Sequence, residues 1–187
     1  MVEVTPLAIE GVFEIRTPRF EDQRGFFSET WNLAHWKEAG IATNFVQDNH
    51  SMSRDRGVVR GLHYQTPPAA QAKLVRASRG AVYDVVVDIR AGSPTFGKWL
   101  SVVLSAERWN QLFVPEGFAH GFLTLEPDTE VQYKTSAPYA PQHDRAIRFD
   151  DPAIGIEWPI DGSEIILSDK DRAAPLLAEI ETGFCYP

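Results

Sequence analysis

Cysteine is almost absent from this chain of 187 residues, in which Cys185 is the only one. A single thiol closes no intrachain disulfide and builds no cysteine-based zinc site, so we expect a protein of the reducing cytoplasm. Long apolar runs are also missing, because none approaches the ~20 residues that span a bilayer. The first residues have neither the basic nor the apolar region of a signal peptide. We therefore expect no membrane partner.

Positive charge is scarce as well. The chain has 18 Lys+Arg against 26 Asp+Glu, for a formal net charge of -8. This balance argues against a general nucleic-acid binder, because phosphate backbones require a positive surface. It leaves room for a small anionic ligand held by a local basic cluster. Hydrophobic residues make up 43% of the chain, and no repeat or linker divides it, so we expect one folded domain over residues 1–187.

What the sequence has is a series of short strand patterns. The clearest covers residues 81–90, where the odd positions are apolar and Asp84, Asp88 and Arg90 share the even face. Further strands are expected at 11–17, 60–65, 73–77, 98–104, 111–114, 121–125, 129–135 and 165–168. One helix is expected at 29–39, ending at Gly40, with short helical turns within 105–110 and 173–179. Many strands and few helices predict an all-β sandwich or small barrel.

Polar residues gather within these patterns. His63 and Gln65 are two positions apart and therefore project from the same face of one strand. Arg60 has the opposite parity unless Gly61 carries a bulge. Other clusters surround Lys73, His120, residues 130–134 and residues 167–171. Taken alone, each histidine is as often a structural residue as a functional one.

A metal site is the next hypothesis, because small barrels of the cupin type bind metals through spaced histidines. The spacing of Pro115, Gly117 and His120 fits the second half of such a motif. In the first half, Gln65 stands where a second histidine ligand belongs, and a neutral amide is a poor ligand beside imidazoles. The ammonium of Lys73 further disfavours a bound cation. The pattern favours the barrel and argues against a metal.

Longer blocks of sequence carry a resemblance. They lie at residues 20–29, 47–49, 59–65, 73–75, 84–90, 93–97, 115–122 and 167–171. In this order they closely resemble the dTDP-4-dehydrorhamnose 3,5-epimerase family over nearly the whole chain. The resemblance implies a cupin-type double-stranded β-helix, or jelly-roll, with a few short helices. It also implies a homodimer without metal or other cofactor that acts on dTDP-4-dehydro-6-deoxy-D-glucose.

The resemblance also implies catalytic roles. His63 would be the base, which suits a side chain that titrates near neutral pH. Tyr133 would be the acid, since a phenol is protonated at neutral pH. Lys73 would stabilise the enolate at the C4 oxygen of the sugar. Asp171 would orient the imidazole of His63, with Asp84 as an alternative partner.

The remaining roles that the resemblance implies are in substrate binding. Arginine and lysine would surround the phosphates, polar residues would contact the sugar and base, and an aromatic ring would stack on the thymine. One residue departs from the family, which usually has Glu where this chain has Asp144. The expected binding residues are Arg24, Glu29, Gln47, Asn49, Arg60, His120, Tyr139, Asp144 and Lys170.

Three alternatives remain open from the sequence. A relative could epimerise only C3 or only C5, or could be a ketoisomerase of a related dTDP-4-keto-deoxysugar pathway. A metal-dependent cupin oxygenase is a second alternative, against which Gln65 argues. A non-catalytic sugar-binding barrel is the third, and it would have no need of a base, an acid and a lysine together.

Overall fold

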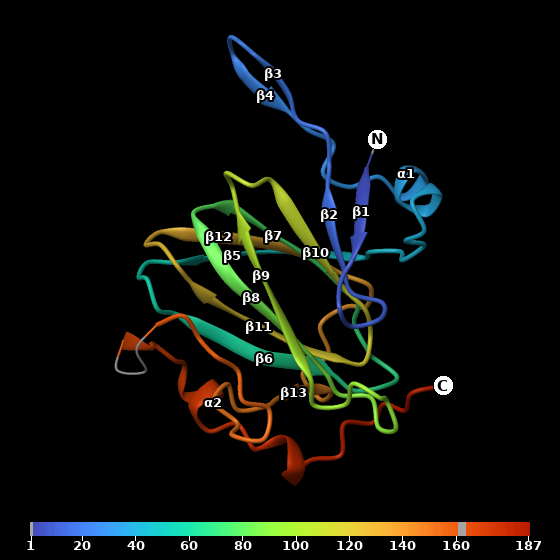
Figure 1. Cartoon of the computed structure of the whole chain (residues 1–187), viewed down its shortest axis with the longest axis vertical. Coiled ribbons are helices and arrows are strands. Elements are labelled where there is room, and N and C mark those ends of the chain that lie inside the picture. The colour runs from blue at the N-terminus through green and yellow to red at the C-terminus, as the bar shows by residue number, and fades with distance from the viewer. Residues whose placement is uncertain (1, 161–163) are drawn as a thin grey trace.

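Two antiparallel sheets face each other in the computed structural model, which describes residues 2–160 and 164–187 (Figure 1). The six-stranded sheet has the order β1-β2-β10-β7-β12-β5, and the five-stranded sheet has the order β13-β6-β11-β8-β9. The first sheet comprises β1 (Glu3–Pro6), β2 (Phe13–Arg16), β5 (Gln47–Ser53), β7 (Lys73–Arg79), β10 (Asn110–Val114) and β12 (Thr129–Thr135). The second comprises β6 (Val59–Gln65), β8 (Ala81–Asp88), β9 (Trp99–Ser105), β11 (Phe118–Thr124) and β13 (Asp144–Ala146). The predicted all-β class is confirmed.

Strand β8 is buried on both of its faces. Its odd positions, including Val85 and Val87, pack on the outer side of their sheet, beneath the C-terminal part of the chain. Its even positions Val82 and Val86 belong to the core between the two sheets. Asp84 lies on that same inner face and has no exposed surface. The alternation therefore predicted the strand correctly, and its polar face is the one turned into the barrel.

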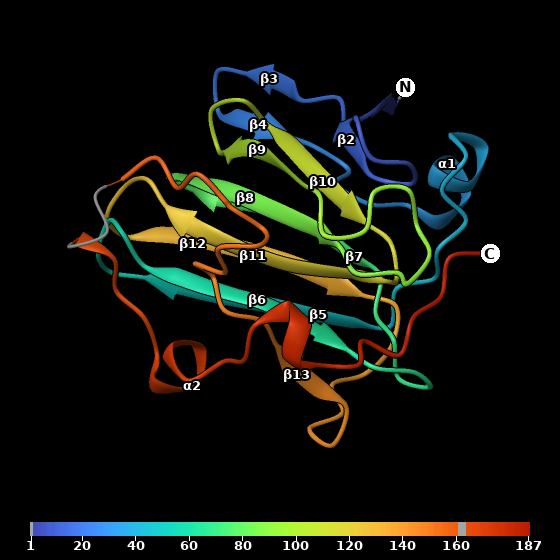
Figure 2. The ribbon, with the colours of Figure 1, turned by 60° about the horizontal axis from the view of Figure 1, so that its bottom comes forward.

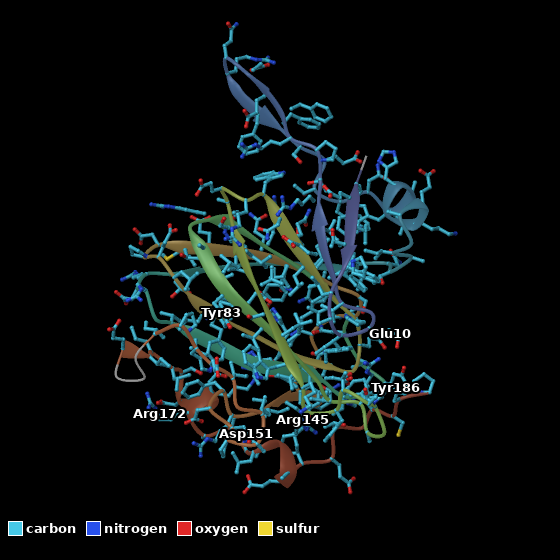
Figure 3. The ribbon with its side chains drawn as sticks, viewed as in Figure 1. Glu10, Tyr83, Arg145, Asp151, Arg172 and Tyr186 are labelled. Carbon is cyan, nitrogen blue, oxygen red and sulfur yellow. The ribbon has the colours of Figure 1, made fainter. Side chains whose placement is uncertain are left out.

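The C-terminal part of the chain crosses the outer side of the five-stranded sheet (Figure 2). It contains two short helices, α2 (Asp169–Arg172) and the 3-10 helix η2 (Leu177–Glu179). The Tyr186 hydroxyl donates to the Glu10 carboxylate at 2.8 Å, on the side of the molecule where Figure 3 labels both residues. This path brings α2 beside β6, where the candidate site lies.

A small hairpin of β3 (Phe20–Asp22) and β4 (Gly25–Phe27) extends away from the barrel (Figure 1). Three of its aromatic side chains are exposed: Phe20 at 64%, Phe26 at 55% and Phe27 at 70%. Exposed apolar side chains gathered in this way are typical of a contact surface.

Some expected elements differ from the structure. The helix expected at 29–39 is α1 (Leu33–Glu38), because the Asn32 side chain caps its first turn. The strand expected at 165–168 is wrong, since Ile166 makes a single bridge to Val58. The expected turns hold, with residues 106–109 forming a turn and η2 lying within 173–179. In the described residues, the helices are too short to cross a membrane.

Candidate active site

A pocket of about 450 Å³ opens between the two sheets. Strands β6 and β11 form one wall, strands β5, β7 and β12 form the other, and the segment before and within α2 closes one side. The charged and polar side chains around it are Ser51, Arg60, His63, Lys73, His120, Tyr133, Ser168, Lys170 and Asp171. All four expected catalytic residues therefore meet in one cavity.

His63 is paired with Asp171. Its Nε2 lies 2.5 Å from Asp171 Oδ1, and the His63 side chain is 32% exposed while that of Asp171 is 5% exposed. Burial raises the pKa of Asp171, but the hydrogen bonds and charge of His63, with Ser168 and the Gly61 amide, hold it below its ordinary value. The carboxylate is therefore ionised at neutral pH, and the other ring nitrogen of His63 is left for a ligand.

Ser168 fixes the carboxylate and was not among the expected site residues. It caps α2: its Oγ accepts from the Asp171 amide at 3.1 Å and donates to Asp171 Oδ2 at 2.9 Å. A serine three positions before an acidic residue is a pattern of helix N-termini. That spacing is the sequence signal that could have identified Ser168.

Arg60 faces the same pocket as His63, through a bulge in β6. His120 of β11 pairs with His63, whereas Phe122 pairs with Arg60, so β6 has one more residue than β11 over this interval. The bulge at Gly61 that would bring Arg60 to the same face as His63 is therefore present. The guanidinium donates to Ser53 Oγ and to the Met52 carbonyl, both at 3.2 Å.

Lys73 is buried on the opposite sheet, with 7% of its surface exposed. Its ammonium donates to the His63 carbonyl oxygen at 3.1 Å. Burial lowers the pKa of Lys73 to about 8, against the opposing charges of Asp84 and Asp144. The ammonium is thus close to the site and mostly protonated at neutral pH.

His120 has its own carboxylate partner. Its Nε2 lies 2.8 and 3.0 Å from the two oxygens of Asp84, and both side chains are buried. Burial lowers the pKa of His120 and raises that of Asp84, and the attraction between them opposes both changes. The question left open by the sequence is answered: Asp171 pairs with His63, and Asp84 pairs with His120.

Tyr133 lines the pocket from β12, across from His63 on β6. Burial raises the pKa of its phenol, which Arg60 lowers in part. The hydroxyl therefore keeps its proton at neutral pH and is able to donate it.

Five of the expected binding residues form a connected chain beside Tyr133. The Tyr139 hydroxyl donates to Asp144 Oδ2 at 3.2 Å, and Lys170 makes an ion pair with the same carboxylate. The Tyr139 amide donates to Gln47 Oε1 at 2.9 Å, and Gln47 Nε2 donates to Asn49 Oδ1 at 2.9 Å. The ring of Tyr139 is 58% exposed and free to stack. Although the family usually has Glu at this position, Asp144 still places a carboxylate in contact with Lys170.

Two expected binding residues lie elsewhere. Arg24 is at the tip of the β3–β4 hairpin, where its guanidinium pairs with Asp22. Glu29 bonds to Asn32 and His35 beside α1. Neither lines the pocket of its own chain.

Gln65 is engaged with the backbone. Its Nε2 donates to the carbonyls of Ala69 at 2.7 Å and Pro138 at 3.2 Å, and its Oε1 accepts from the Ala140 amide at 2.7 Å. The amide therefore has no free oxygen for a cation, and the Lys73 ammonium lies against the backbone of His63. These residues do not fit a cupin metal site. Over residues 2–160 and 164–187, no three His, Cys, Asp or Glu side chains gather as metal ligands would.

Comparison with known proteins identifies the family and the fold. Residues 6–179 match the family model described as dTDP-4-dehydrorhamnose 3,5-epimerase. A Sinorhizobium fredii protein of that name is 51% identical over 96% of this chain and 92% of its own length. The crystal structure of the Legionella pneumophila 3,5-epimerase in complex with dTDP-4-keto-L-rhamnose has a TM-score of 0.95 and 42% identity, with full coverage of both chains. A Streptomyces bikiniensis 3'-monoepimerase in complex with dTDP-quinovose has a TM-score of 0.86 and 40% identity, over 92% of this chain and 87% of its own.

The barrel and its pocket define a sugar-nucleotide epimerase of the cupin jelly-roll class, and the predicted fold is confirmed. Within that class, this chain belongs to the dTDP-4-dehydrorhamnose 3,5-epimerase family.

Proposed function

We propose that the pocket epimerises dTDP-4-dehydro-6-deoxy-D-glucose at C3 and C5 to give dTDP-4-dehydro-L-rhamnose. The observation that carries this proposal is the position of His63 and Tyr133 on facing sheets, with the pocket between them. Inversion at carbon requires a proton to leave one face of the sugar and another to arrive on the opposite face. A base and an acid on opposite walls meet that requirement.

His63 removes the proton. Both C3 and C5 are adjacent to the C4 carbonyl, so one base serves both carbons as the sugar presents each in turn. Asp171 holds the imidazole in place and stabilises its protonated form, as the carboxylate does in a catalytic triad. Ser168 and the start of α2 keep the carboxylate aimed at the ring.

Lys73 stabilises the enolate that forms at C4. A buried ammonium interacts with a developing negative charge more strongly than an exposed one does, because water does not screen it. Its pKa of about 8 leaves it mostly charged at neutral pH. Tyr133 then delivers a proton to the far face of the ring. None of these steps uses a metal ion.

Substrate binding depends on cations in a chain of net charge -8. Arg60 and Lys170 lie on the pocket wall and would contact the two phosphates. Tyr139 would stack on the thymine, held at its backbone by Gln47. His120 would contact the sugar beside the base.

We further propose that the chain works in the cytoplasm as a homodimer. The β3–β4 hairpin extends from the barrel with exposed aromatic side chains, and Arg24 at its tip does not reach its own pocket. In a dimer, the hairpin would carry Arg24 and Glu29 to the pocket of the partner and complete the phosphate and sugar contacts there.

A single-centre epimerase is the second candidate. The similarity to a 3'-monoepimerase shows that this fold also serves chemistry at one carbon. The two candidates differ in which carbons lose their proton, so isotope exchange separates them.

The test is to incubate the protein with dTDP-4-dehydro-6-deoxy-D-glucose in heavy water and to locate deuterium by NMR. Label and inversion at both C3 and C5 support the double epimerase, whereas label at one carbon supports the second candidate. In Tyr133→Phe the enolate still forms and His63 returns a proton to the same face. Label should therefore enter while inversion falls roughly 10²–10⁴-fold, the usual effect of losing a positioned acid. Equal loss of label and inversion would remove Tyr133 from the role of acid.

Mixing two impaired variants tests the dimer. Arg24→Ala should weaken both sites of a homodimer, and His63→Ala should inactivate both. In a mixed dimer, the site that keeps His63 receives Arg24 from the other chain, so activity should return when the variants are unfolded and refolded together. Activity that stays low after mixing would show that Arg24 does not serve a partner's pocket.

A further inference from the structure

Two glycines meet where β6 passes β11, next to three residues of the site. A Cβ built on Gly121 would lie 2.8 Å from the Arg60 carbonyl oxygen and 3.1 Å from Gly61 Cα. A Cβ built on Gly61 would lie 2.5 Å from Gly121 Cα and 2.8 Å from the His120 carbonyl oxygen. Three of these four distances are below 3.0 Å, which real Cβ atoms essentially never show, so these two backbones approach each other this closely because both residues are glycine.

Gly121 is unusual among the glycines of this chain. Eleven of the twelve glycines in the described residues have positive φ, a conformation that L-residues avoid, and Gly121 is the exception. Its φ lies outside the range that L-residues avoid. The reason for glycine at position 121 is therefore space, and the space is taken by the bulge of β6.

The bulge determines what faces the pocket. It inserts one residue between Arg60 and His63, which brings both side chains to the same cavity. It also turns the Gly61 amide toward the Asp171 carboxylate, whose pKa that amide helps to lower. The base, its carboxylate partner and a phosphate-binding arginine thus all depend on how closely β6 approaches β11.

We infer that Gly121 is a positioning residue for the epimerase reaction: its missing side chain admits the β6 bulge and thereby sets the geometry of His63, Asp171 and Arg60. The inference rests on the proposed function for its kinetic readout only. A methyl group at position 121 must push β6 away from β11 by several tenths of an ångström or more, at the strand that carries the base.

The experiment compares Gly121→Ala with Gly92→Ala in the full-length protein. Gly92 is exposed, with φ +82 and open space around its Cα, so its alanine variant loses stability through backbone strain while the pocket is untouched. In Gly121→Ala, kcat should fall about 10²-fold, as expected for a base displaced by about 1 Å. Gly92→Ala should keep the kcat of the original chain while its Tm falls.

A spectroscopic readout is independent of turnover. The proton between His63 and Asp171 should give a far-downfield NMR resonance, assigned by its disappearance in Asp171→Asn. We expect Gly121→Ala to shift or lose this resonance, and Gly92→Ala to retain it. Because no substrate is present, this result stands even if the substrate proposal fails.

Two outcomes would overturn the inference. One is a folded Gly121→Ala protein with the kcat and the resonance of the original chain. The other is failure of both Gly121→Ala and Gly61→Ala to fold, as judged by circular dichroism and gel filtration, because the contact would then serve folding rather than the site.

Discussion

Both histidines that line the pocket are paired with an aspartate, and the two pairs have opposite surroundings. His63 is one-third exposed and its partner has a lowered pKa, so Asp171 remains a carboxylate. His120 and Asp84 are both buried, and burial lowers the pKa of His120 and raises that of Asp84, which favours the neutral form of each. The same two residue types thus form a pair suited to proton transfer and a pair suited to holding a fixed hydrogen bond. Solvent access and the number of hydrogen-bond donors make the difference.

Substitution of the two histidines should separate the two pairs most strongly. His63→Asn should abolish both deuterium uptake and inversion, a loss of roughly 10⁴-fold, because no enolate forms without the base. His120→Asn keeps a hydrogen-bonding side chain beside Asp84, so deuterium uptake should persist with kcat/KM lowered about tenfold. NMR in heavy water measures both. If the two variants lose exchange equally, the division between the pairs is wrong.

Substitution of the two aspartates should also distinguish the pairs, through kcat and its dependence on pH. Asp171→Asn should lower kcat roughly 10²–10⁴-fold, because the amide neither orients the ring correctly nor stabilises its protonated form. Asp84→Asn removes a negative charge that supports the protonated form of Lys73, so activity should begin to fall at a lower pH than in the original chain. The pH profile of kcat for both variants is the measurement. An unchanged alkaline limb in Asp84→Asn would mean that Asp84 does not act on Lys73.

Lys73 interacts with both pairs, and the protonation of its buried amine affects both activity and stability. Its folded-state pKa of about 8 is below the ordinary 10.5, so burial of the charged form costs stability below pH 8, and the cost disappears above 10.5. Lys73→Met should therefore raise the free energy of unfolding by up to about 3 kcal/mol at neutral pH while inactivating the enzyme. In the original chain, activity should fall as pH rises through about 8. Denaturant unfolding checks the first claim, with exposed Lys98→Met as a control that should show little change.

The smallest expected effect concerns acid stability. The folded pKa of His120 is lowered, so its contribution to stability is complete above about pH 6.5 and is lost as pH falls through the folded value. Asp84, Lys73 and His63 act on this imidazole and set the width of that window. His120→Asn should lose less Tm between pH 7 and 5 than the original chain. A larger loss in the variant would reverse the sign argued for the buried pair.

Most of the fold could be predicted because its central strands have apolar patterns of period two. Strand β5 was missed because its inward side chains, including Gln47, Asn49 and Ser51, are polar where they approach the pocket. The β3–β4 hairpin was missed because both of its strands are exposed on both faces. These segments lack the apolar period on which strand prediction depends.

The grouping of His63, Lys73, Tyr133 and Asp171 in one pocket could be expected only through the resemblance. Residue types alone left His63 and His120 undecided, and their different partners, Asp171 and Asp84, are distant in sequence from them. The path of the C-terminal segment beside β6 brings Asp171 to His63, and the pairing of β11 with β8 brings His120 to Asp84. No local sequence pattern encodes either arrangement. Ser168 was missed although its spacing to Asp171 is a capping signal, because the segment was expected to be a strand.

Gln65 has a consequence for redesign of this barrel. Its carboxamide forms hydrogen bonds with three backbone groups. One is the Ala69 carbonyl in a turn, and the others are the Pro138 carbonyl and the Ala140 amide in the loop that carries Tyr139. Replacing it with histidine would place a metal-ligand type at the position while freeing the loop that holds the ring of Tyr139. An engineer who wanted to load this scaffold with iron would have to rebuild that loop first, and would lose the nucleotide contact proposed for Tyr139.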